Sequence, residues 1–276
     1  MKCAWESLLQ ILPPWLRSEV DRLGREEMQE LRLRLGKPPE LVLGKESLWL
    51  NQPCQMDDLN YVINTASRYS PWASETIGEG YLTAPGGHRI GICGKAVVHG
   101  GVLTGIRQPE SLCIRVARDF PRIARDAAKL NGSILIIGPP GWGKTTLLRD
   151  LIRQISMNET VAVVDERGEL FPQGTFEEGK KLDVLTGCPK REGIMMVLRT
   201  MGPSAIGVDE ITAREDCEAL THAGWCGVRL LATVHGSGLK ELKSKSLYKP
   251  LWDGKLFDHF LVLDREKHFH EERMEP

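Results

Sequence analysis

A glycine-rich segment near the middle of the chain has the residue types and spacing of a phosphate-binding loop. Residues 138–145 read Gly-Pro-Pro-Gly-Trp-Gly-Lys-Thr, which fits GxxxxGK followed by Ser or Thr. In such a loop, backbone N–H groups point at phosphate oxygens, the lysine reaches the β- and γ-phosphates and acts in catalysis, and the hydroxyl ligates Mg²⁺. The pattern predicts that ATP and Mg²⁺ bind here, through Gly138, Pro139, Pro140, Gly141, Trp142, Gly143, Lys144, Thr145 and Thr146.

Two acids follow an apolar run later in the chain. Residues 205–208 read Ala-Ile-Gly-Val and lead into Asp209 and Glu210. An acid in this place can hold Mg²⁺ directly or through water, so Asp209 is predicted to be a metal residue together with Thr145. Glu210 is then predicted to be the catalytic residue that orients and deprotonates the attacking water. The alternative is a strand that ends in a solvated acidic turn.

Two further apolar runs end in polar residues. One leads into Asp165 and Glu166, and the other leads into His235. Because the carboxyl ends of parallel strands meet at the ligand-binding edge of a sheet, Asp165 is a second candidate for Mg²⁺ and Glu166 a candidate catalytic residue. His235 is a candidate sensor of the γ-phosphate. An ion pair between these acids and Arg167 is the structural alternative.

The elements that must position these residues are predicted from hydrophobic periodicity. In the second half of the chain, short and fully apolar runs alternate with segments of helical spacing. This rhythm indicates an α/β fold with a mainly parallel sheet covered on both faces. The phosphate-binding pattern lies between a strand at 133–137 and a helix at 146–155, the context that the motif requires. The other strands are predicted at 161–164, 205–208, 230–234 and 260–263.

The first half of the chain has a different texture and predicts a mixed α+β domain. Residues 30–35 alternate with period two, as in a half-buried strand, and 57–69 have helical spacing. Glycine-rich turns separate further strands, which indicates antiparallel hairpins, and a linking helix is predicted at 120–130. The predicted domains are therefore 1–125 and 126–276. The remaining strands are expected at 41–43, 47–50, 81–83, 88–98, 102–108 and 112–117.

Composition and charge limit the classes of protein to which the chain can belong. Apolar residues make up 41% and charged residues 26% of the chain, and the formal net charge is −1, as in an ordinary soluble globular protein. The seven cysteines contain no CxxC, so neither a disulfide framework nor a zinc site is expected. No run approaches the roughly 18 apolar residues of a transmembrane segment, and the first residues lack the features of a signal peptide. A cytoplasmic location is predicted.

These residues, in this order, resemble the stage III sporulation protein AA family, whose relatives are the secretion ATPases of type II and type IV systems. The resemblance covers most of the chain. In the first half it is carried by residues 30–38, 85–91 and 111–117. In the second half it is carried by 138–145, 164–167, 188–193, 198–201, 208–210 and 232–236. Secretion ATPases often have Gly-Glu where this chain has Asp209-Glu210, which leaves the metal arrangement open.

The resemblance implies a RecA-like P-loop NTPase domain that assembles into a homo-oligomeric ring, expected to be a hexamer. It also implies docking on an integral membrane protein of a channel complex, with the ATPase peripheral at the inner face of the membrane. Relatives bind ATP between their two domains, and arginines complete the site. By that resemblance Arg89, Arg107 or Arg115 is expected at the γ-phosphate, and Arg199 near the metal as a catalytic residue.

Two other functions remain open from the sequence. Seven Lys or Arg residues stand against two acids in residues 81–125, which would suit a nucleic-acid-stimulated ATPase. Only Tyr81 and Phe120 are aromatic there, whereas single-strand binding favours interleaved stacking residues, so a nucleic-acid partner is not expected. The third possibility is a nucleotide-gated structural ring with little turnover, which the presence of Glu210 disfavours.

Overall fold

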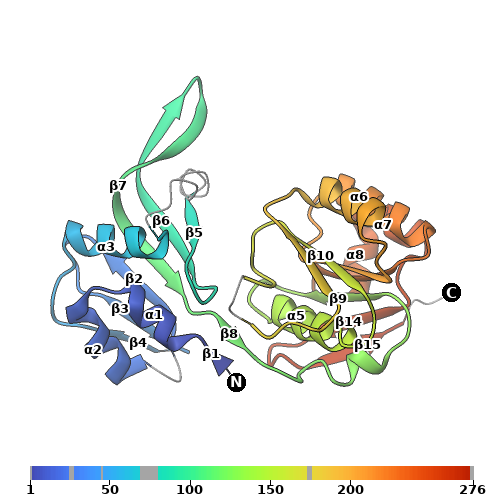
Figure 1. Ribbon diagram of the computed structural model, residues 1–276, viewed down its shortest axis with the longest axis horizontal. Helices are drawn as coiled ribbons and strands as arrows, with labels where there is room; N and C mark the ends of the chain where they lie inside the picture. Colours follow the sequence, from blue (N-terminus) through green and yellow to red (C-terminus); the bar gives the residue numbers. More distant parts are fainter. Residues whose placement is uncertain (1, 25–27, 45, 69–79, 173–175, 274–276) are drawn as a thin grey trace. The chain divides into compact units, whose positions relative to one another are not determined.

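The computed structural model describes residues 2–24, 28–44, 46–68, 80–172 and 176–273. The chain forms two compact units (Figure 1). The first unit is Met1–Asp119 together with Pro172–Phe176, and the second is Phe120–Phe171 together with Glu177–Pro276. Within the described ranges, no helix has both the length and the apolar character needed to cross a bilayer.

The first unit is built on an antiparallel sheet of six strands in the order β4-β3-β2-β7-β6-β5. Leu31, Leu33 and Ile114 on one face of this sheet are fully buried. They share one hydrophobic core with the helices α1 (Trp5–Ile11), α2 (Pro14–Gly24) and α3 (Met56–Ala66). A short strand pair, β1 (Lys2–Cys3) with β8 (Arg118–Asp119), joins the two ends of the unit. The strands of the sheet are β2 (Met28–Arg34), β3 (Glu40–Leu43), β4 (Glu46–Trp49), β5 (Tyr81–Thr83), β6 (Arg89–His99) and β7 (Val102–Arg115).

The longest hairpin of this sheet consists of β6 and β7. The prediction of two separate strands at 102–108 and 112–117 is wrong, because β7 runs continuously from Val102 to Arg115. The register between β6 and β7 shifts at a bulge at Gly94, opposite the gap between the two predicted strands. Gln108 has a φ of 52°, and its carbonyl oxygen would lie 2.3 Å from a Cβ at position 94. Only glycine fits there, so the strand continues past the distortion.

The second unit contains a seven-stranded sheet in the order β11-β10-β12-β13-β9-β14-β15. Every neighbouring pair is parallel except β14 with β15. The edge strands β11 and β15 were not predicted, because their side chains are only partly buried and include charged residues. The strands are β9 (Ile134–Gly138), β10 (Val161–Asp165), β11 (Leu182–Thr186), β12 (Ala205–Val208), β13 (Arg229–His235), β14 (His259–Leu263) and β15 (Phe269–Glu272).

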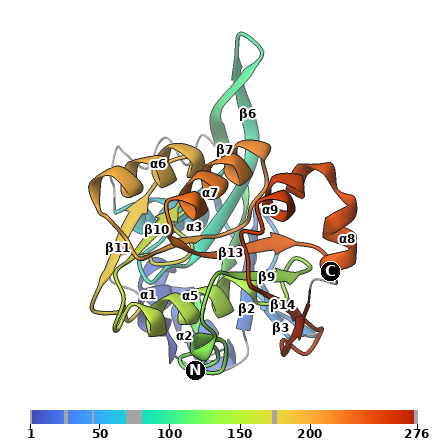
Figure 2. The same cartoon turned by 90° about the vertical axis from the view of Figure 1, so that its right-hand side faces the viewer.

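Helices cover both faces of this sheet (Figure 2). On one face, α5 (Lys144–Ile155) packs in a core with Ile134 and Ile136 of β9. On the other face, α6 (Lys190–Thr200) and α7 (Arg214–Trp225) lie side by side and share a core with the alternate β9 residues. The short helices α8 (Leu239–Ser244) and α9 (Lys249–Asp253) belong to the same core as α6 and α7. The predicted mainly parallel sheet with two covered faces is confirmed.

The segment that opens the second unit differs from the prediction. Residues 120–130 were expected to form a helix, but they form turns and a single 3₁₀ turn at Ala127–Lys129. The buried carboxylate of Asp150 in α5 accepts the backbone N–H groups of Arg122 and Ala124, at 3.0 and 2.8 Å. These bonds, together with the positive φ of Arg122, fix a non-helical path against α5.

Candidate nucleotide and magnesium site

The predicted phosphate-binding loop connects β9 to α5. Its two glycines after the prolines, Gly141 and Gly143, have φ angles of 78° and 94°, which other residues rarely adopt. Gly143 is the N-cap of α5, so the positive end of the helix dipole is directed to the loop. A Cβ at Gly138 would lie 3.2 Å from the Leu263 Cβ, so the start of the loop also requires a small residue. Strand, loop and helix thus follow one another as an anion site needs.

Lys144 is buried at the base of this loop and is 5% exposed. Its Nζ donates to the carbonyl oxygen of Pro139 at 2.9 Å and to Nδ1 of His235 at 2.7 Å. Burial lowers the pKa of Lys144, while the nearby carboxylates of Asp209 and Glu210 act in the opposite direction. A partly desolvated ammonium group attracts anionic phosphate oxygens more strongly than one in bulk water.

Thr145 and Asp209 meet at the carboxyl edge of the sheet. Oγ1 of Thr145 donates to Oδ2 of Asp209 at 2.6 Å, and Oγ1 of Thr233 donates to the other carboxylate oxygen at 2.5 Å. The Thr233 hydroxyl also accepts the backbone N–H of Glu210 at 2.8 Å. A hydroxyl and a carboxylate are oxygen donors of the kind that Mg²⁺ prefers, so this pair fits the ion. Sequence reasoning missed Thr233, although a threonine within an apolar run was visible.

Glu210 follows Asp209 in an unusual backbone conformation, with a φ of 54°. One carboxylate oxygen lies 3.0 Å from Nε2 of His235, and the other lies 3.3 Å from Nη1 of Arg167. Because Nδ1 of His235 accepts from Lys144, its Nε2 carries the proton that bonds Glu210. His235 therefore bridges the phosphate-loop lysine and the predicted base.

Asp165 has a different environment, although it also ends a strand. It is 3% exposed, and its carboxylate accepts the backbone N–H groups of Glu169, Leu170 and Phe171 at 2.8, 2.9 and 3.0 Å. Burial raises the pKa of Asp165 to about 6 against the effect of these bonds. Both oxygens are thus occupied in holding the loop after β10. These bonds give Asp165 a structural role, and its predicted contact with Mg²⁺ stays a prediction.

Glu166 forms an ion pair that the sequence did not predict. Its partner is Lys190, the first residue of α6, whose Nζ lies 2.5 Å from Oε2 of Glu166. Arg167, the partner in the structural alternative considered from the sequence, pairs with Glu210 instead. Lys190 is 7% exposed, so the pair neutralises a charge that burial would otherwise penalise. Glu166 and Lys190 line one pocket with Asp209 and Glu210.

Arg199 lies at the opposite end of α6 from the pocket residue Lys190, and its predicted place near the metal stays a prediction. Arg199 is exposed in the last turn of α6, where its Nε donates to the carbonyl oxygen of Met195 at 3.0 Å. The helix begins at Lys190 beside Glu166, nine residues earlier, which corresponds to about 14 Å along the axis. Because α6 runs antiparallel to the strands, Arg199 lies toward the amino end of the sheet.

The three arginines expected at the γ-phosphate all belong to the first unit. The guanidinium of Arg89 stacks over the ring of Tyr81 at 4.6 Å, and Nε of Arg115 lies 3.5 Å from a carboxylate oxygen of Glu30. Arg107 is exposed on the distal part of the β6–β7 hairpin. These contacts all lie within the first unit, and the predicted contact of an arginine with the γ-phosphate stays a prediction.

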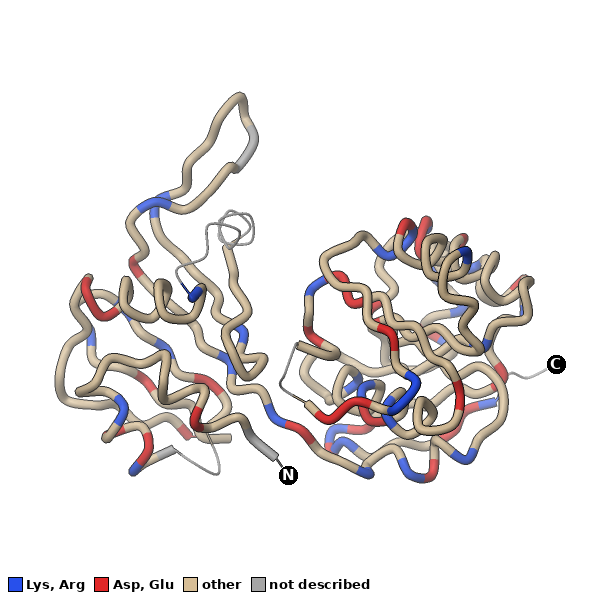
Figure 3. The backbone as a smooth tube through the Cα atoms, in the orientation of Figure 1, with Lys and Arg blue, Asp and Glu red and all other residues tan. Residues whose placement is uncertain are grey.

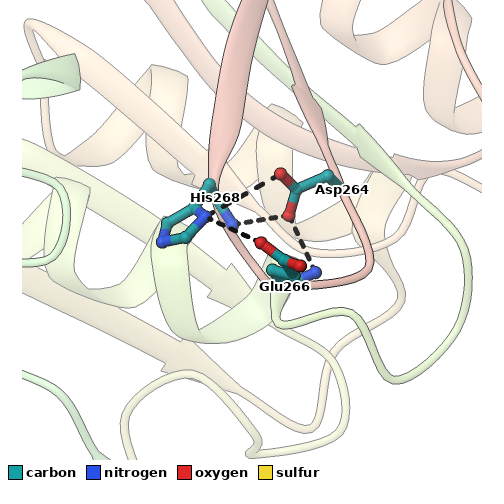
Figure 4. A group of neighbouring side chains, drawn as sticks. All are labelled: Asp264, Glu266 and His268. Atoms are coloured by element: carbon teal, nitrogen blue, oxygen red, sulfur yellow. Dashed lines mark hydrogen bonds and ion pairs between the residues drawn. The ribbon is translucent and has the colours of Figure 1, made fainter.

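A separate group of polar side chains lies in the turn between β14 and β15 (Figure 4). Asp264, Glu266 and His268 point toward one another, and Nδ1 of His268 is 3.9 Å from an oxygen of each acid. Oδ1 of Asp264 accepts the backbone N–H groups of Glu266 and His268, each at 2.9 Å. This is how aspartate stabilises a tight turn, so we assign the group a local structural role.

Known proteins are similar to this chain over nearly its whole length. The family model for sporulation stage III, protein AA, matches residues 5–273. Stage III sporulation protein AA of Bacillus subtilis (strain 168) is 35% identical over 283 residues, which cover 94% of this chain and 91% of that protein. Protein SEEDLING PLASTID DEVELOPMENT 1 of Arabidopsis thaliana is 26% identical over 255 residues, covering 88% of this chain and 35% of that protein.

Solved structures confirm the fold. The X-ray structure of the Legionella pneumophila ATPase DotB matches with a TM-score of 0.60 and 18% identity, covering 94% of this chain and 79% of DotB. The pilus retraction motor PilT with bound ADP matches with a TM-score of 0.63 and 14% identity, covering 90% of this chain and 77% of PilT. The second unit is therefore a RecA-like domain. With the match of the family model over nearly all its residues, the chain belongs to the stage III sporulation protein AA family.

Proposed function

We propose that this protein is a Mg²⁺-dependent ATPase that works as a ring-forming, secretion-ATPase-like motor for an envelope channel during sporulation. The observation that carries the proposal is the 2.6 Å contact between Thr145 of the phosphate-binding loop and Asp209. It brings the hydroxyl and the carboxylate of two distant motifs together beside a buried lysine. Glu210, the residue that would activate water, comes next in the chain.

Each residue of the site has a proposed task. The backbone N–H groups of residues 141–146 and the ammonium of Lys144 bind the phosphates, and Thr145 and Asp209 hold Mg²⁺. Bound Mg²⁺ would supply positive charge that offsets the charge of the phosphate oxygens. Glu210 orients and deprotonates the attacking water. His235, which bonds both Lys144 and Glu210, senses the γ-phosphate through the lysine that it shares with the loop.

The proposal also covers the assembly of the protein and its location in the cell. The RecA-like fold, shared with DotB and PilT, supports a homo-oligomeric ring, which we propose to be a hexamer. Arg89, Arg107 or Arg115 is proposed to complete the nucleotide site at the γ-phosphate. We also propose a cytoplasmic protein that docks on an integral membrane protein of the channel. Membership of the sporulation family supports this setting.

Steady-state ATP hydrolysis at a series of protein concentrations tests the function. Wild type and Lys144→Ala are compared, with Mg²⁺ present or chelated. We expect specific activity that rises with concentration, as shared sites in a ring require, and activity that disappears in the variant or with chelator. Hydrolysis that survives Lys144→Ala would contradict the assigned site. Specific activity independent of concentration would contradict the shared sites.

One observation favours a second candidate, a nucleotide-gated ring with little turnover. Both carboxylate oxygens of Glu210 are engaged, one by His235 and one by Arg167. A base held in this way has to leave a partner before it can bind water. If this arrangement limits turnover, Arg167→Ala raises the hydrolysis rate while ATP affinity stays the same. A rate that is unchanged or lower in Arg167→Ala argues against the gate.

A further inference from the structure

The β6–β7 hairpin extends beyond the rest of its sheet (Figure 1). The strand β5 pairs with β6 only at residues 89–91, and β2 pairs with β7 only at 111–115. Among the described residues, the strands from Lys95 to Arg107 therefore pair only with each other. We call residues 95–107 the arm. A two-stranded ribbon is marginally stable in water, so an arm of this kind gains from a covering partner.

The end of the arm carries no formal charge and exposes apolar side chains to solvent, with the polar His99 and Thr104 beside them. Between Lys95 and Arg107 the sequence contains no charged residue. Ala96 is exposed, and the side chain of Val98 is 57% exposed. Gly100 and Gly101 form the turn, with φ angles of 58° and 84°. A projection without formal charge that exposes valine is an unusual feature for a surface that meets only water.

Two basic residues stand where the arm leaves the sheet. Lys95 and Arg107 are cross-strand partners, and both are exposed. In Figure 3 both strands of the projecting hairpin carry blue near its base, and its described residues beyond that point are tan. Like charges directly opposite each other destabilise a strand pair, so this placement has a cost that a negatively charged partner would remove. From Lys95 to His99 the strand rises about 13 Å.

We propose that the arm inserts its apolar end into the surface of an anionic lipid bilayer, with Lys95 and Arg107 against the headgroups. The arm extends about 13 Å beyond the basic pair, so it is long enough to reach the depth of roughly 5–10 Å at which interfacial elements lie. Headgroups and water at that depth can satisfy the unpaired backbone groups of the two outer edges. Two adjacent cations without an acid between them match a diffuse negative surface.

Flotation with lipid vesicles tests the proposal on the full chain without nucleotide. The vesicles are phosphatidylcholine alone, or phosphatidylcholine with about a third phosphatidylglycerol. We expect wild type to float with the anionic vesicles. Val98→Asp lowers this partitioning at least about tenfold, because a charge enters the apolar end. Lys95→Gln combined with Arg107→Gln lowers it by about thirtyfold, at roughly a factor of five for each charge.

Trp225→Ser is the matched control, because Trp225 is 76% exposed and belongs to α7 in the second unit. It should float as wild type does, and no variant should unfold at a markedly lower temperature than wild type. Absence of wild-type flotation, or equal flotation of Val98→Asp, overturns the proposal. If Val98→Asp floats normally but sediments as a smaller species without lipid, the arm is a contact between copies and the proposal fails. Because no nucleotide is present, these results are independent of the proposed ATPase activity.

Discussion

Two Asp-Glu pairs occupy equivalent positions in the second unit. Asp165 ends β10 and is followed by Glu166, Asp209-Glu210 directly follows β12, and these strands are parallel neighbours in the sheet. Both pairs line the same pocket. Their surroundings nevertheless differ, and the difference decides which pair is available to a ligand.

The first residue of each pair illustrates the contrast. Asp165 accepts three backbone N–H groups from the loop that follows it. Asp209 is held by the hydroxyls of Thr145 and Thr233. A backbone N–H can only donate, so a metal at Asp165 would have to compete with fixed donors. A hydroxyl can rotate and offer its lone pairs, so Thr145 can share an ion with Asp209. A carboxylate at a strand end becomes a metal site only where its neighbours can also coordinate.

The largest expected difference concerns the two glutamates. Glu210→Gln removes the proposed base, so the rate of ATP hydrolysis should fall about a hundredfold or more while ATP still binds. Glu166→Gln removes one side of an ion pair with Lys190, and its effect on the rate should be less than about tenfold. Single-turnover hydrolysis and ATP affinity measured on both variants test this. Equal rate losses in the two variants would contradict the proposal that Glu210, and not Glu166, activates water.

Asp165 should reveal its structural role through pH. Its folded pKa of about 6 lies above the ordinary value of 3.8, so the folded state takes up the proton first. The resulting stabilisation is complete below the unfolded pKa and is lost as pH rises through the folded pKa. The free energy of unfolding of wild type minus that of Asp165→Asn should therefore grow by up to about 3 kcal/mol between pH 7 and pH 4. Chemical denaturation without Mg²⁺ or nucleotide measures it, and a gap independent of pH would contradict the buried carboxylate.

The partner of Glu166 should matter to stability rather than to chemistry. Glu166→Gln leaves the buried ammonium of Lys190 without its counter-charge, at a cost of about 1–2 kcal/mol in the free energy of unfolding. The double variant Glu166→Gln, Lys190→Met should recover most of this loss, because no unpaired charge remains. Denaturant unfolding of the single and double variants shows whether the ion pair acts only through stability. Failure of the second change to restore stability would point to the latter.

The smallest effect is expected for Arg199, at the other end of the same helix. Arg199→Ala should change the free energy of unfolding by less than about 0.5 kcal/mol and leave the hydrolysis rate within about twofold of wild type. A rate loss as large as that of Glu210→Gln would mean that Arg199 reaches a nucleotide site after all.

Contiguous patterns made much of this site predictable from the sequence. The residues of the phosphate-binding loop are adjacent in the chain, and the runs before Asp165, Asp209 and His235 are fully apolar. Such runs identify central parallel strands, whose carboxyl ends must share one edge. The edge strands β11 and β15 were missed because half-exposed strands lack that apolar run.

Pairings between distant residues were not predictable. Nothing local indicates that Glu166 meets Lys190 while Arg167 meets Glu210, since both distances depend on how α6 and the loop after β10 pack. The position of Arg199 within the second unit has a related cause. A helix that begins at the site carries its last turn away from it, and the length of α6 became clear only in three dimensions.

The most direct test of the two-pair account is a Mg²⁺ titration of ATP hydrolysis in the matched variants Asp209→Asn and Asp165→Asn. The account predicts that Asp209→Asn needs far more Mg²⁺ and loses about a hundredfold or more in rate at ordinary Mg²⁺. Asp165→Asn, studied below its unfolding temperature, should keep the wild-type Mg²⁺ dependence. A shift in Mg²⁺ dependence for Asp165→Asn that equals or exceeds that of Asp209→Asn would contradict the account.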